Sequence, residues 1–150
     1  NDRARIVLSA GETSAENNSS AIILVRIDGR AFLFTGDAGI EALTSALFFA
    51  NSANIDLSAL EILQVPHHGS KRNIGPTVLN SIGARYAFIS AAKQGAPKHP
   101  SRRVTNALLR RNIAPYVTQG RGLRHASANA PARQGWRPAQ KVDFVEWFQD

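Results

Sequence analysis

Two short segments of the chain carry the residue types that bind metal ions. The sequence Thr-Gly-Asp37 follows the apolar run 31–34, and Pro-His67-His68-Gly follows the apolar run 60–65. Carboxylates and imidazoles are donors that zinc and other borderline divalent ions accept. Because each segment ends a strand-like run, we expect these side chains to be held on rigid backbone at the edge of a sheet. The two segments therefore predict part of a metal centre.

Each of these residues also has a simpler interpretation. Asp37 could instead cap a helix that begins near Gly39. Adjacent side chains on an extended segment diverge, so we expect only one of His67 and His68 to bind the ion and the other to line the pocket or contact substrate. His99 could be a third pocket residue or simply a loop histidine. His125 lies in a basic tail and carries no usable signal.

Basic residues surround the histidines and dominate the second half of the chain. Ser70, Lys71 and Arg72 add a hydroxyl and two cations, which would stabilise the charge that develops on a phosphoryl group during transfer, although ordinary loop polarity would also explain them. Residues 62–142 hold 14 basic residues and no acidic one, whereas residues 1–61 hold 4 basic and 8 acidic residues. The positive field of this 81-residue stretch would attract polyanions or phosphate esters, and a solubilising basic face is the alternative.

Length and composition limit the classes of protein to consider. With 150 residues, of which 43% are hydrophobic, the chain can bury one core. The absence of cysteine excludes disulfides and thiolate metal sites. No apolar run approaches the roughly 20 residues that a membrane-spanning helix needs, and no segment resembles a signal peptide. We therefore expect a soluble segment without membrane contact, with a cytoplasmic location favoured. Because the chain contains no methionine and starts with Asn1, we also expect it to be a fragment.

Strands and helices alternate along the chain after an initial hairpin. The dipeptide Asp28-Gly29 between two β-rich runs is a strong hairpin signal. Pro76 and Ser101 are each typical of a helix start. The expected elements are strands at 21–27 and 31–35, a helix at 39–51, a strand at 60–65, a helix at 77–82, a strand at 86–90, a helix from 101 to about 111 and a strand at 113–118. This order predicts an α/β layered fold with functional residues in loops at strand ends.

The ends of the chain have a different composition from its centre. Residues 1–20 form a polar lead-in, within which 9–20 is expected to be a loop. The structured part extends over residues 21–118. Residues 119–140 are rich in glycine, alanine, arginine and proline, which predicts a basic flexible loop, and 141–150 could form a terminal strand or a short helix.

Taken together in their order, these motifs resemble a known family. The run Asn-Asn-Ser-Ser20, the strand pair ending in Phe-Thr-Gly-Asp37, the segment Val-Pro-His67-His68-Gly-Ser70 and Lys98-His99-Pro are similar to the C-terminal half of a metallo-β-lactamase-superfamily domain. Within that superfamily the ComEC-type branch of DNA-uptake proteins and its free-standing relatives is most similar. The resemblance covers roughly residues 17–118 of this sequence.

The resemblance implies half of an αββα sandwich with a mixed sheet, flanking helices and a hydrolytic centre of one or two metals. By position Asp37 and His68 would be metal ligands, and Asp37 would bridge two ions. His67, His99 and Ser70 would be catalytic residues. Lys71, Arg72 and Lys98 would bind substrate phosphate. Zinc is the favoured metal and manganese an alternative, with up to two ions in the intact domain.

The chain departs from the family in one respect. The His-x-His-x-Asp-His motif that supplies most ligands of the first metal does not occur in the sequence. Asp37 and one or two histidines are too few ligands for a closed zinc site. We therefore expect the chain alone to be inactive and to associate with a missing N-terminal half of the domain or with a second copy of itself.

Two functions remain after these considerations. The first is a hydrolase in which a metal-bound hydroxide attacks a phosphoester or nucleic acid. The second is a non-catalytic basic module that binds nucleic acid or a partner and whose metal site is degenerate. Metal-dependent turnover would distinguish the first from the second, because a binding module would show salt-dependent affinity without cleavage.

Overall fold

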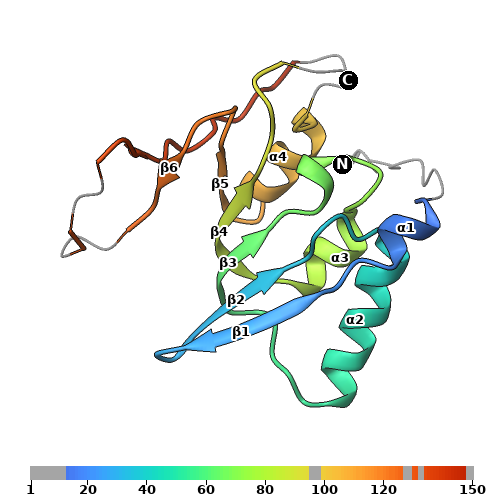
Figure 1. Ribbon diagram of the computed structural model, residues 1–150. Coiled ribbons are helices and arrows are strands. Elements are labelled where there is room, and N and C mark those ends of the chain that lie inside the picture. The colour runs from blue at the N-terminus through green and yellow to red at the C-terminus, as the bar shows by residue number, and fades with distance from the viewer. Residues whose placement is uncertain (1–12, 95–98, 127–129, 132–133, 148–150) are drawn as a thin grey trace, which may run out of the picture.

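A five-stranded sheet forms the centre of the computed structural model, which describes residues 13–94, 99–126, 130–131 and 134–147 (Figure 1). Its strands are β1 (Ile23–Ile27), β2 (Arg30–Phe34), β3 (Leu60–Gln64), β4 (Ala84–Ile89) and β5 (Ala114–Val117), adjacent to one another in that order. The pair β1–β2 is antiparallel, and the other three pairs are parallel. The carboxyl ends of β2 to β5 therefore lie along one edge of the sheet. The α/β fold with a mixed sheet is confirmed.

The hairpin forms where the sequence predicts it. Ile23 pairs with Phe34 and Ile27 with Arg30, which leaves Asp28 and Gly29 as the turn. Both turn residues have positive φ, 51° and 72°, as a two-residue turn that matches the strand twist requires.

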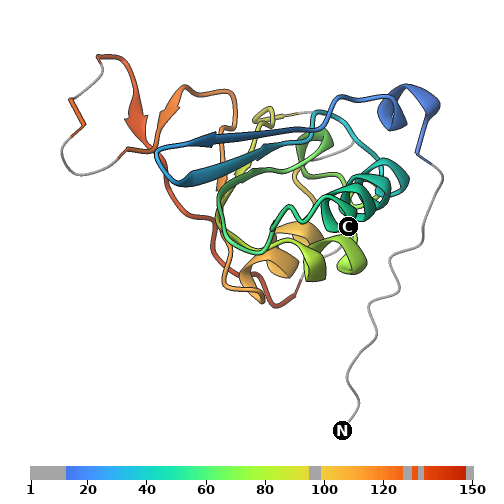
Figure 2. The ribbon, with the colours of Figure 1, turned by 90° about the horizontal axis from the view of Figure 1, so that it is seen from below.

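Three helices cover one face of the sheet. They are α2 (Ile40–Ser52), α3 (Pro76–Ser81) and α4 (Arg102–Leu109), and Figure 2 shows all three on the same side of the strands. Pro76 occupies the first turn of α3, and the Ser101 hydroxyl accepts a hydrogen bond from Arg103 N at the start of α4. The core between helices and sheet consists of fully buried apolar side chains, among them Leu33, Leu43, Leu63, Val65, Val78, Ala87, Val104 and Leu108.

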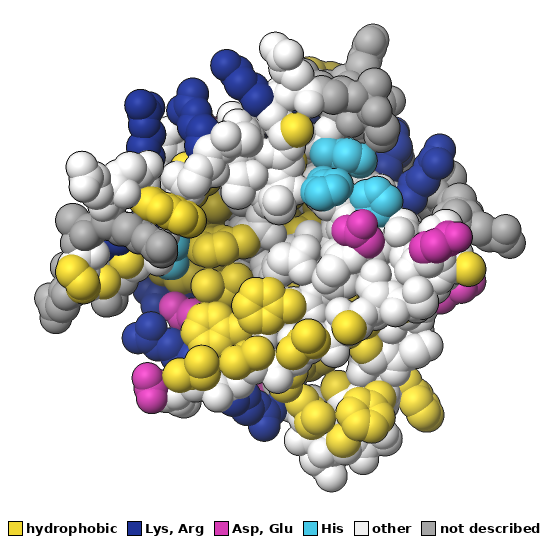
Figure 3. Space-filling view, in the orientation of Figure 1, with side chains coloured by type: hydrophobic (Ala, Val, Ile, Leu, Met, Phe, Trp, Pro, Cys, Tyr) yellow, Lys and Arg dark blue, Asp and Glu magenta, His cyan; other side chains and the backbone are white. Residues whose placement is uncertain are grey.

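The opposite face of the sheet is apolar and largely uncovered by the described residues. Its side chains come from paired strand positions, because cross-strand partners point to the same face. They include Ile23, Val25, Ile27, Phe32, Phe34, Ile62, Tyr86, Phe88 and Tyr116. We call this set the open face. Ile23, Ile27 and Phe34 are 53%, 57% and 45% exposed, and Figure 3 shows hydrophobic side chains gathered over these strands.

His125 packs against one end of the open face. Its ring centroid lies 4.2 Å from that of Tyr86 and 5.6 Å from those of Phe88 and Tyr116. The segment that carries His125 includes β6 (Leu123–Arg124), which pairs in parallel with β7 (Arg137–Pro138). The stretch predicted as a basic loop thus contains a short strand pair, which the sequence pattern does not reveal because each strand has two residues.

Two further local predictions differ from the structure. The loop expected at 9–20 contains a helical turn, α1 (Ala15–Asn18), because the Ser14 hydroxyl accepts a hydrogen bond from Asn17 N as an N-cap. The terminal strand or helix is also wrong for residues 141–147, where Lys141 makes an isolated bridge to Tyr116. Among the described residues, no helix is long and apolar enough to cross a membrane.

Candidate functional site

The side chain of Gln64 joins the ends of β2 and β3. Its Oε1 accepts hydrogen bonds from Thr35 N at 2.8 Å and Gly36 N at 2.9 Å, and its Nε2 donates to Val65 O at 2.8 Å. His67 N in turn donates to Gly36 O at 3.1 Å. These bonds hold the segment that carries Asp37 against the segment that carries the adjacent histidines.

The backbone after β3 turns sharply in the left-handed region. His67, His68 and Gly69 form η1 (His67–Gly69), and their φ values are 44°, 57° and 80°. A left-handed conformation costs a residue with a side chain roughly 1–2 kcal/mol, so the surrounding contacts must hold both histidines in it. At Gly69 a Cβ would lie 2.7 Å from Pro100 Cβ, which leaves no room for a side chain.

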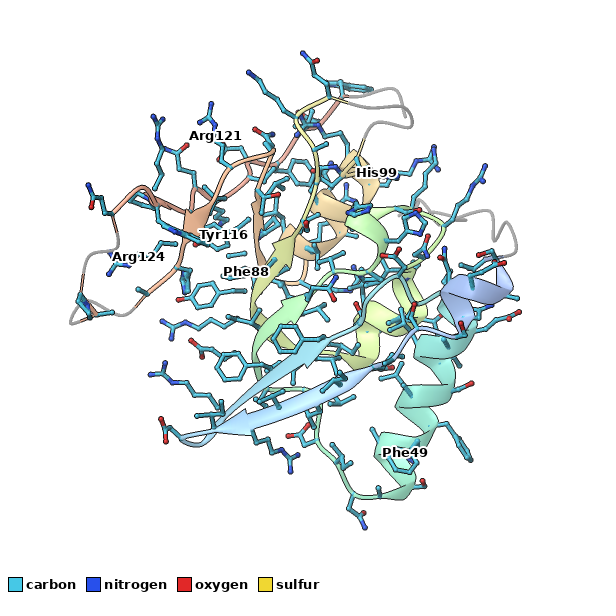
Figure 4. All side chains as sticks on the ribbon, in the orientation of Figure 1. Phe49, Phe88, His99, Tyr116, Arg121 and Arg124 are labelled. Carbon is cyan, nitrogen blue, oxygen red and sulfur yellow. The ribbon has the colours of Figure 1, made fainter. Side chains whose placement is uncertain are left out.

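This turn brings together histidines that the sequence predicts to diverge. The ring centroids of His67 and His68 lie 5.8 Å apart, and that of His99 lies 6.0 and 6.2 Å from them. Adjacent side chains point apart only on an extended backbone, and here the backbone is left-handed. His99 reaches the cluster because Ser101 N donates to Gly69 O at 3.0 Å. Figure 3 shows the three histidines as one patch with acidic side chains beside it, and Figure 4 shows His99 at this edge of the sheet.

The imidazole of His99 is partly buried beside the other two. Its Nδ1 is buried and has no hydrogen-bond partner among the described residues. Burial lowers the pKa of His99 below its ordinary value of 6.5, and the proximity of His67 and His68 lowers it further. His99 is therefore neutral at pH 7 in this structure, and one of its two ring nitrogens has a free lone pair.

The two adjacent histidines have different hydrogen-bond partners. Nδ1 of His68 lies 2.6 Å from Ser90 O, a carbonyl that can only accept, so Nδ1 carries the proton and Nε2 keeps its lone pair. Such a bond to a carbonyl is typical of metal-binding histidines. Nδ1 of His67 lies 2.8 Å from Asn17 Nδ2, a donor, so in that bond Nδ1 accepts and Nε2 carries the proton. His68 is thus prepared to bind a cation, and His67 to donate a hydrogen bond.

Asp37 lies exposed directly after β2. Its backbone carbonyl accepts a hydrogen bond from Asn73 Nδ2 at 3.0 Å, and Asn73 is buried. The helix that follows begins at Ile40 with Gly39 as its N-cap residue, and no side chain caps it. The alternative role of Asp37 as the cap of this helix is therefore wrong, and its carboxylate remains available to a ligand.

The remaining predicted residues lie in the turn after the histidines. Ser70 is buried, and its hydroxyl accepts a hydrogen bond from Arg72 N at 3.2 Å, so it shapes the turn. Lys71 is half-buried and Arg72 is exposed. Lys98 lies outside the described residues. The catalytic role of Ser70 and the phosphate-binding roles of the cations stay predictions.

The donor set suits zinc chemically but is incomplete. Among the residues that the structure describes, no group of three or more histidine, aspartate or glutamate side chains is arranged to hold a metal ion. A catalytic zinc site requires about three protein ligands and an open position. Asp37 and His68 have donor types that fit such a site, and the described residues do not complete it.

Three amides that organise the site were not predicted from the sequence. Gln64 is a polar residue at the end of an otherwise buried strand, and that contrast could have marked it. Asn73 could have been suspected from its position in the loop after the histidines. Asn17 is separated from His67 by 50 residues, and no local pattern connects the two.

The fold and the site define an α/β protein with a histidine cluster at the carboxyl edge of a mixed sheet. No protein-family model matches the chain, and no solved structure matches it. The chain is 28% identical to ComE operon protein 3 of Bacillus subtilis over 113 residues, which are 75% of this chain and 14% of that protein. It is 35% identical to Recombination protein 2 of Haemophilus influenzae over 98 residues, which are 65% of this chain and 12% of that protein.

These two matches show a ComEC-like relationship. The matched regions span about an eighth of either relative, 14% and 12% of their lengths. The activity of either whole relative can therefore only be proposed for this chain.

Proposed function

We propose that this chain is one half of a metal-dependent hydrolase of the metallo-β-lactamase superfamily, in its ComEC-type branch. The observation that carries the proposal is the convergence of His67, His68 and His99 at the carboxyl edge of the sheet, next to the strand end that bears Asp37. The ComEC-like relationship supports the branch. The resemblance of the Thr-Gly-Asp37 and Pro-His67-His68-Gly motifs supports the superfamily.

The hydrogen bonds of the site residues suggest a different role for each of them in the proposed hydrolase. Asp37 and His68 would contribute to the metal site, His68 through the nitrogen that Ser90 leaves free. The metal, zinc or alternatively manganese, would supply Lewis-acid chemistry and activate water. His67 would donate a hydrogen bond to a substrate oxygen from Nε2. His99, neutral at pH 7, would accept a proton or a hydrogen bond in the same pocket.

The remaining ligands would come from outside this chain. The incomplete donor set and the open face support the same conclusion, because a second sheet packed on the open face would cover its aromatic side chains and could bring further ligands to the edge. We propose the N-terminal half of the same domain as this second layer. A second copy of the chain would be the alternative occupant.

We propose a phosphoester as the substrate, with nucleic acid as the leading candidate. The cations Lys71 and Arg72 directly follow the histidines, and the 81 residues from 62 to 142 contain no carboxylate side chain. A positive surface around the site would hold an anionic substrate and stabilise charge in the transition state. A neutral lactam or thioester would gain nothing from it.

The test compares two variants of the intact native protein. We expect the protein to bind metal and to cleave labelled DNA or a small phosphodiester, and His68→Ala to lower both metal content and cleavage by at least about 100-fold. Phe49→Ala is the control, since Phe49 is exposed on α2, away from the open face. Metal content is measured by plasma mass spectrometry. A fully active His68→Ala protein would overturn the proposal.

A second function is favoured by one observation. The donor set is incomplete among the described residues, while exposed cations such as Arg72 and Arg121 are abundant. A basic module that binds nucleic acid without cleaving it would explain both. In that case the intact protein would bind DNA with strong salt dependence, and neither added zinc nor added manganese would produce turnover.

A further inference from the structure

A basic groove lies beside the outer strand of the sheet, apart from the histidine cluster. Its volume is about 420 Å³. Its polar lining comes from the end of β5 and from the segments that carry β6 and β7, and comprises Thr118, Gln119, Arg121, Arg137, Gln140, Lys141 and Asp143. Val117, Leu123 and Val142 contribute apolar side chains to the lining. Figure 4 shows Arg121 extending from this part of the molecule.

Both walls of the groove are hydrogen-bonded to the sheet. After β5 the chain makes a tight turn in which Arg121 N donates to Thr118 O at 3.0 Å, with positive φ at Gln119 and Gly120. The segment after β7 lies against β5, where Lys141 bridges to Tyr116 and Val142 N donates to Pro115 O at 2.8 Å. These bonds hold the backbone at Arg121 and at Lys141 against β5.

The cations of the groove are not neutralised within the described part of the chain. Arg121, Arg137 and Lys141 are exposed, and none of them forms an ion pair there. Asp143 is the acidic residue of the lining. Three cations and one carboxylate leave the groove with a net positive charge. Guanidinium and ammonium groups lining a groove suit the phosphates of an extended anionic chain.

Backbone hydrogen bonds connect the turn at the start of the groove to the segment that contacts His68. Ser90, whose carbonyl accepts from His68, is followed by Ala91, and Ala91 N lies 3.0 Å from Thr118 Oγ1. Gly120 N also donates to Ala91 O, at 3.1 Å. The turn that begins the groove is therefore attached next to the residue that orients His68. The groove and the cluster therefore both lie at the carboxyl edge of the sheet.

We infer that this groove binds the phosphodiester backbone of a single nucleic-acid strand. The inference rests on the proposed function for its substrate class, and it assigns a role to the basic segment that follows β5. A groove of about 420 Å³ has the size of a small-molecule site, so we expect it to hold a few nucleotides of one strand and not a duplex. Its site is distinct from Lys71 and Arg72 beside the histidines.

The test measures binding of a fluorescein-labelled 20-nucleotide DNA strand to the intact protein by anisotropy, with chelator present so that no cleavage occurs. For single strands the slope of log K against log salt is about −0.7 per phosphate neutralised. We expect the combined variant Arg121→Ala, Arg137→Ala and Lys141→Ala to weaken binding at least about 30-fold and to reduce that slope by about 2. Arg26→Ala, an exposed cation on β1, is the matched control and should change affinity less than about twofold.

The single charge reversal Arg121→Glu is a second test in case the combined variant misfolds. Arg121 is exposed, so a substitution there leaves the core intact. The reversal should weaken binding about tenfold or more with unchanged thermal unfolding. Unchanged affinity in both groove variants, an equal loss in Arg26→Ala, or a loss confined to duplex DNA would overturn the inference.

The experiments distinguish failure of the groove inference from failure of the hydrolase proposal. If the groove variants lose binding and the intact protein never cleaves DNA, the hydrolase proposal is wrong and the groove inference is supported. If the intact protein cleaves DNA and the groove variants bind it normally, the groove inference is wrong and the hydrolase proposal is supported.

Discussion

The side-chain amide nitrogen of Asn17 lies 2.8 Å from Nδ1 of His67. The contact joins a helical turn near the beginning of the described chain to the loop after β3. It gives His67 the opposite tautomer to its neighbour His68, whose Nδ1 faces the carbonyl of Ser90 at 2.6 Å. Two histidines that are adjacent in sequence thereby differ in which ring nitrogen carries the proton, Nε2 in His67 and Nδ1 in His68.

Substitution of Asn17 should reverse the tautomer of His67. In Asn17→Asp the carboxylate can only accept, so the proton should move to Nδ1 of His67 and leave Nε2 with a lone pair. Long-range proton–nitrogen NMR correlations of the imidazole distinguish the two states directly. Asn17→Ala should remove the preference, while the signals of His68 remain those of an Nδ1-protonated ring. A wild-type His67 protonated on Nδ1 would contradict the assignment.

Gly69 should tolerate no side chain, and a second glycine provides the comparison. Both Gly69 and Gly29 have positive φ, 80° and 72°, but a Cβ at Gly29 meets nothing within 4 Å, whereas one at Gly69 lies 2.7 Å from Pro100 Cβ. Gly29→Ala should therefore lower the free energy of unfolding by about 1 kcal/mol through backbone strain. Gly69→Ala should lower it by about 2–4 kcal/mol, because steric overlap adds to the strain. Urea unfolding of both variants measures the difference, and equal losses would show that the contact with Pro100 is relieved freely.

His99 should make the stability of the metal-free protein depend on pH. Its pKa in the folded state lies below the ordinary value of 6.5, because burial and then the neighbouring His67 and His68 disfavour its charged form. As the pH falls below 6.5, the unfolded chain binds a proton at His99 before the folded chain does, so the free energy of unfolding decreases. Well above pH 6.5 His99 is neutral in both the folded and the unfolded state and contributes no pH dependence.

Unfolding by urea at several pH values between 5 and 8 tests this prediction. His99→Gln should show a shallower loss of stability between pH 6.5 and 5 than the wild-type protein. A His99→Gln protein with an unchanged slope would assign the pH dependence to other groups.

The open face should drive association when this chain is prepared alone. Phe34 is 45% exposed on the open face, and Phe49 is 65% exposed on α2, on the other side of the sheet (Figure 4). Burial of a large apolar side chain contributes about 1.5–3 kcal/mol, so Phe34→Glu should weaken association at least about tenfold. Phe49→Glu should leave it unchanged. Sedimentation equilibrium measures both, and an equal effect of the two substitutions would refute a specific role of the open face.

Local interactions explain why much of the fold could be predicted from the sequence. The hairpin at Asp28 and Gly29 follows from the positive φ that its turn requires. The start of α4 at Ser101 follows from an N-cap hydrogen bond two residues along the chain. The placement of Asp37 and His67 at strand ends follows from apolar runs that stop there. Each of these signals depends on residues close together in sequence.

The arrangement of the site could not be predicted in the same way. The expectation that His67 and His68 diverge assumed an extended backbone, and the left-handed turn that brings their rings together is held by contacts with Gly36 and with the segment at Pro100. The approach of His99 and the hydrogen bond of Asn17 join residues far apart in sequence. Local patterns carry no information about such pairs.

The sequence by itself determined the alternation of elements, the strand ends that carry the donors and the excess of positive charge, because turn sterics, capping and periodicity act within a few residues. The tertiary structure alone decided which ring nitrogen of His67 and of His68 is free, which apolar face lacks a covering layer among the described residues, and how Arg121 and Lys141 come to line one groove. These properties depend on parallel strand pairing and on packing between distant segments, whose energies come from long-range contacts.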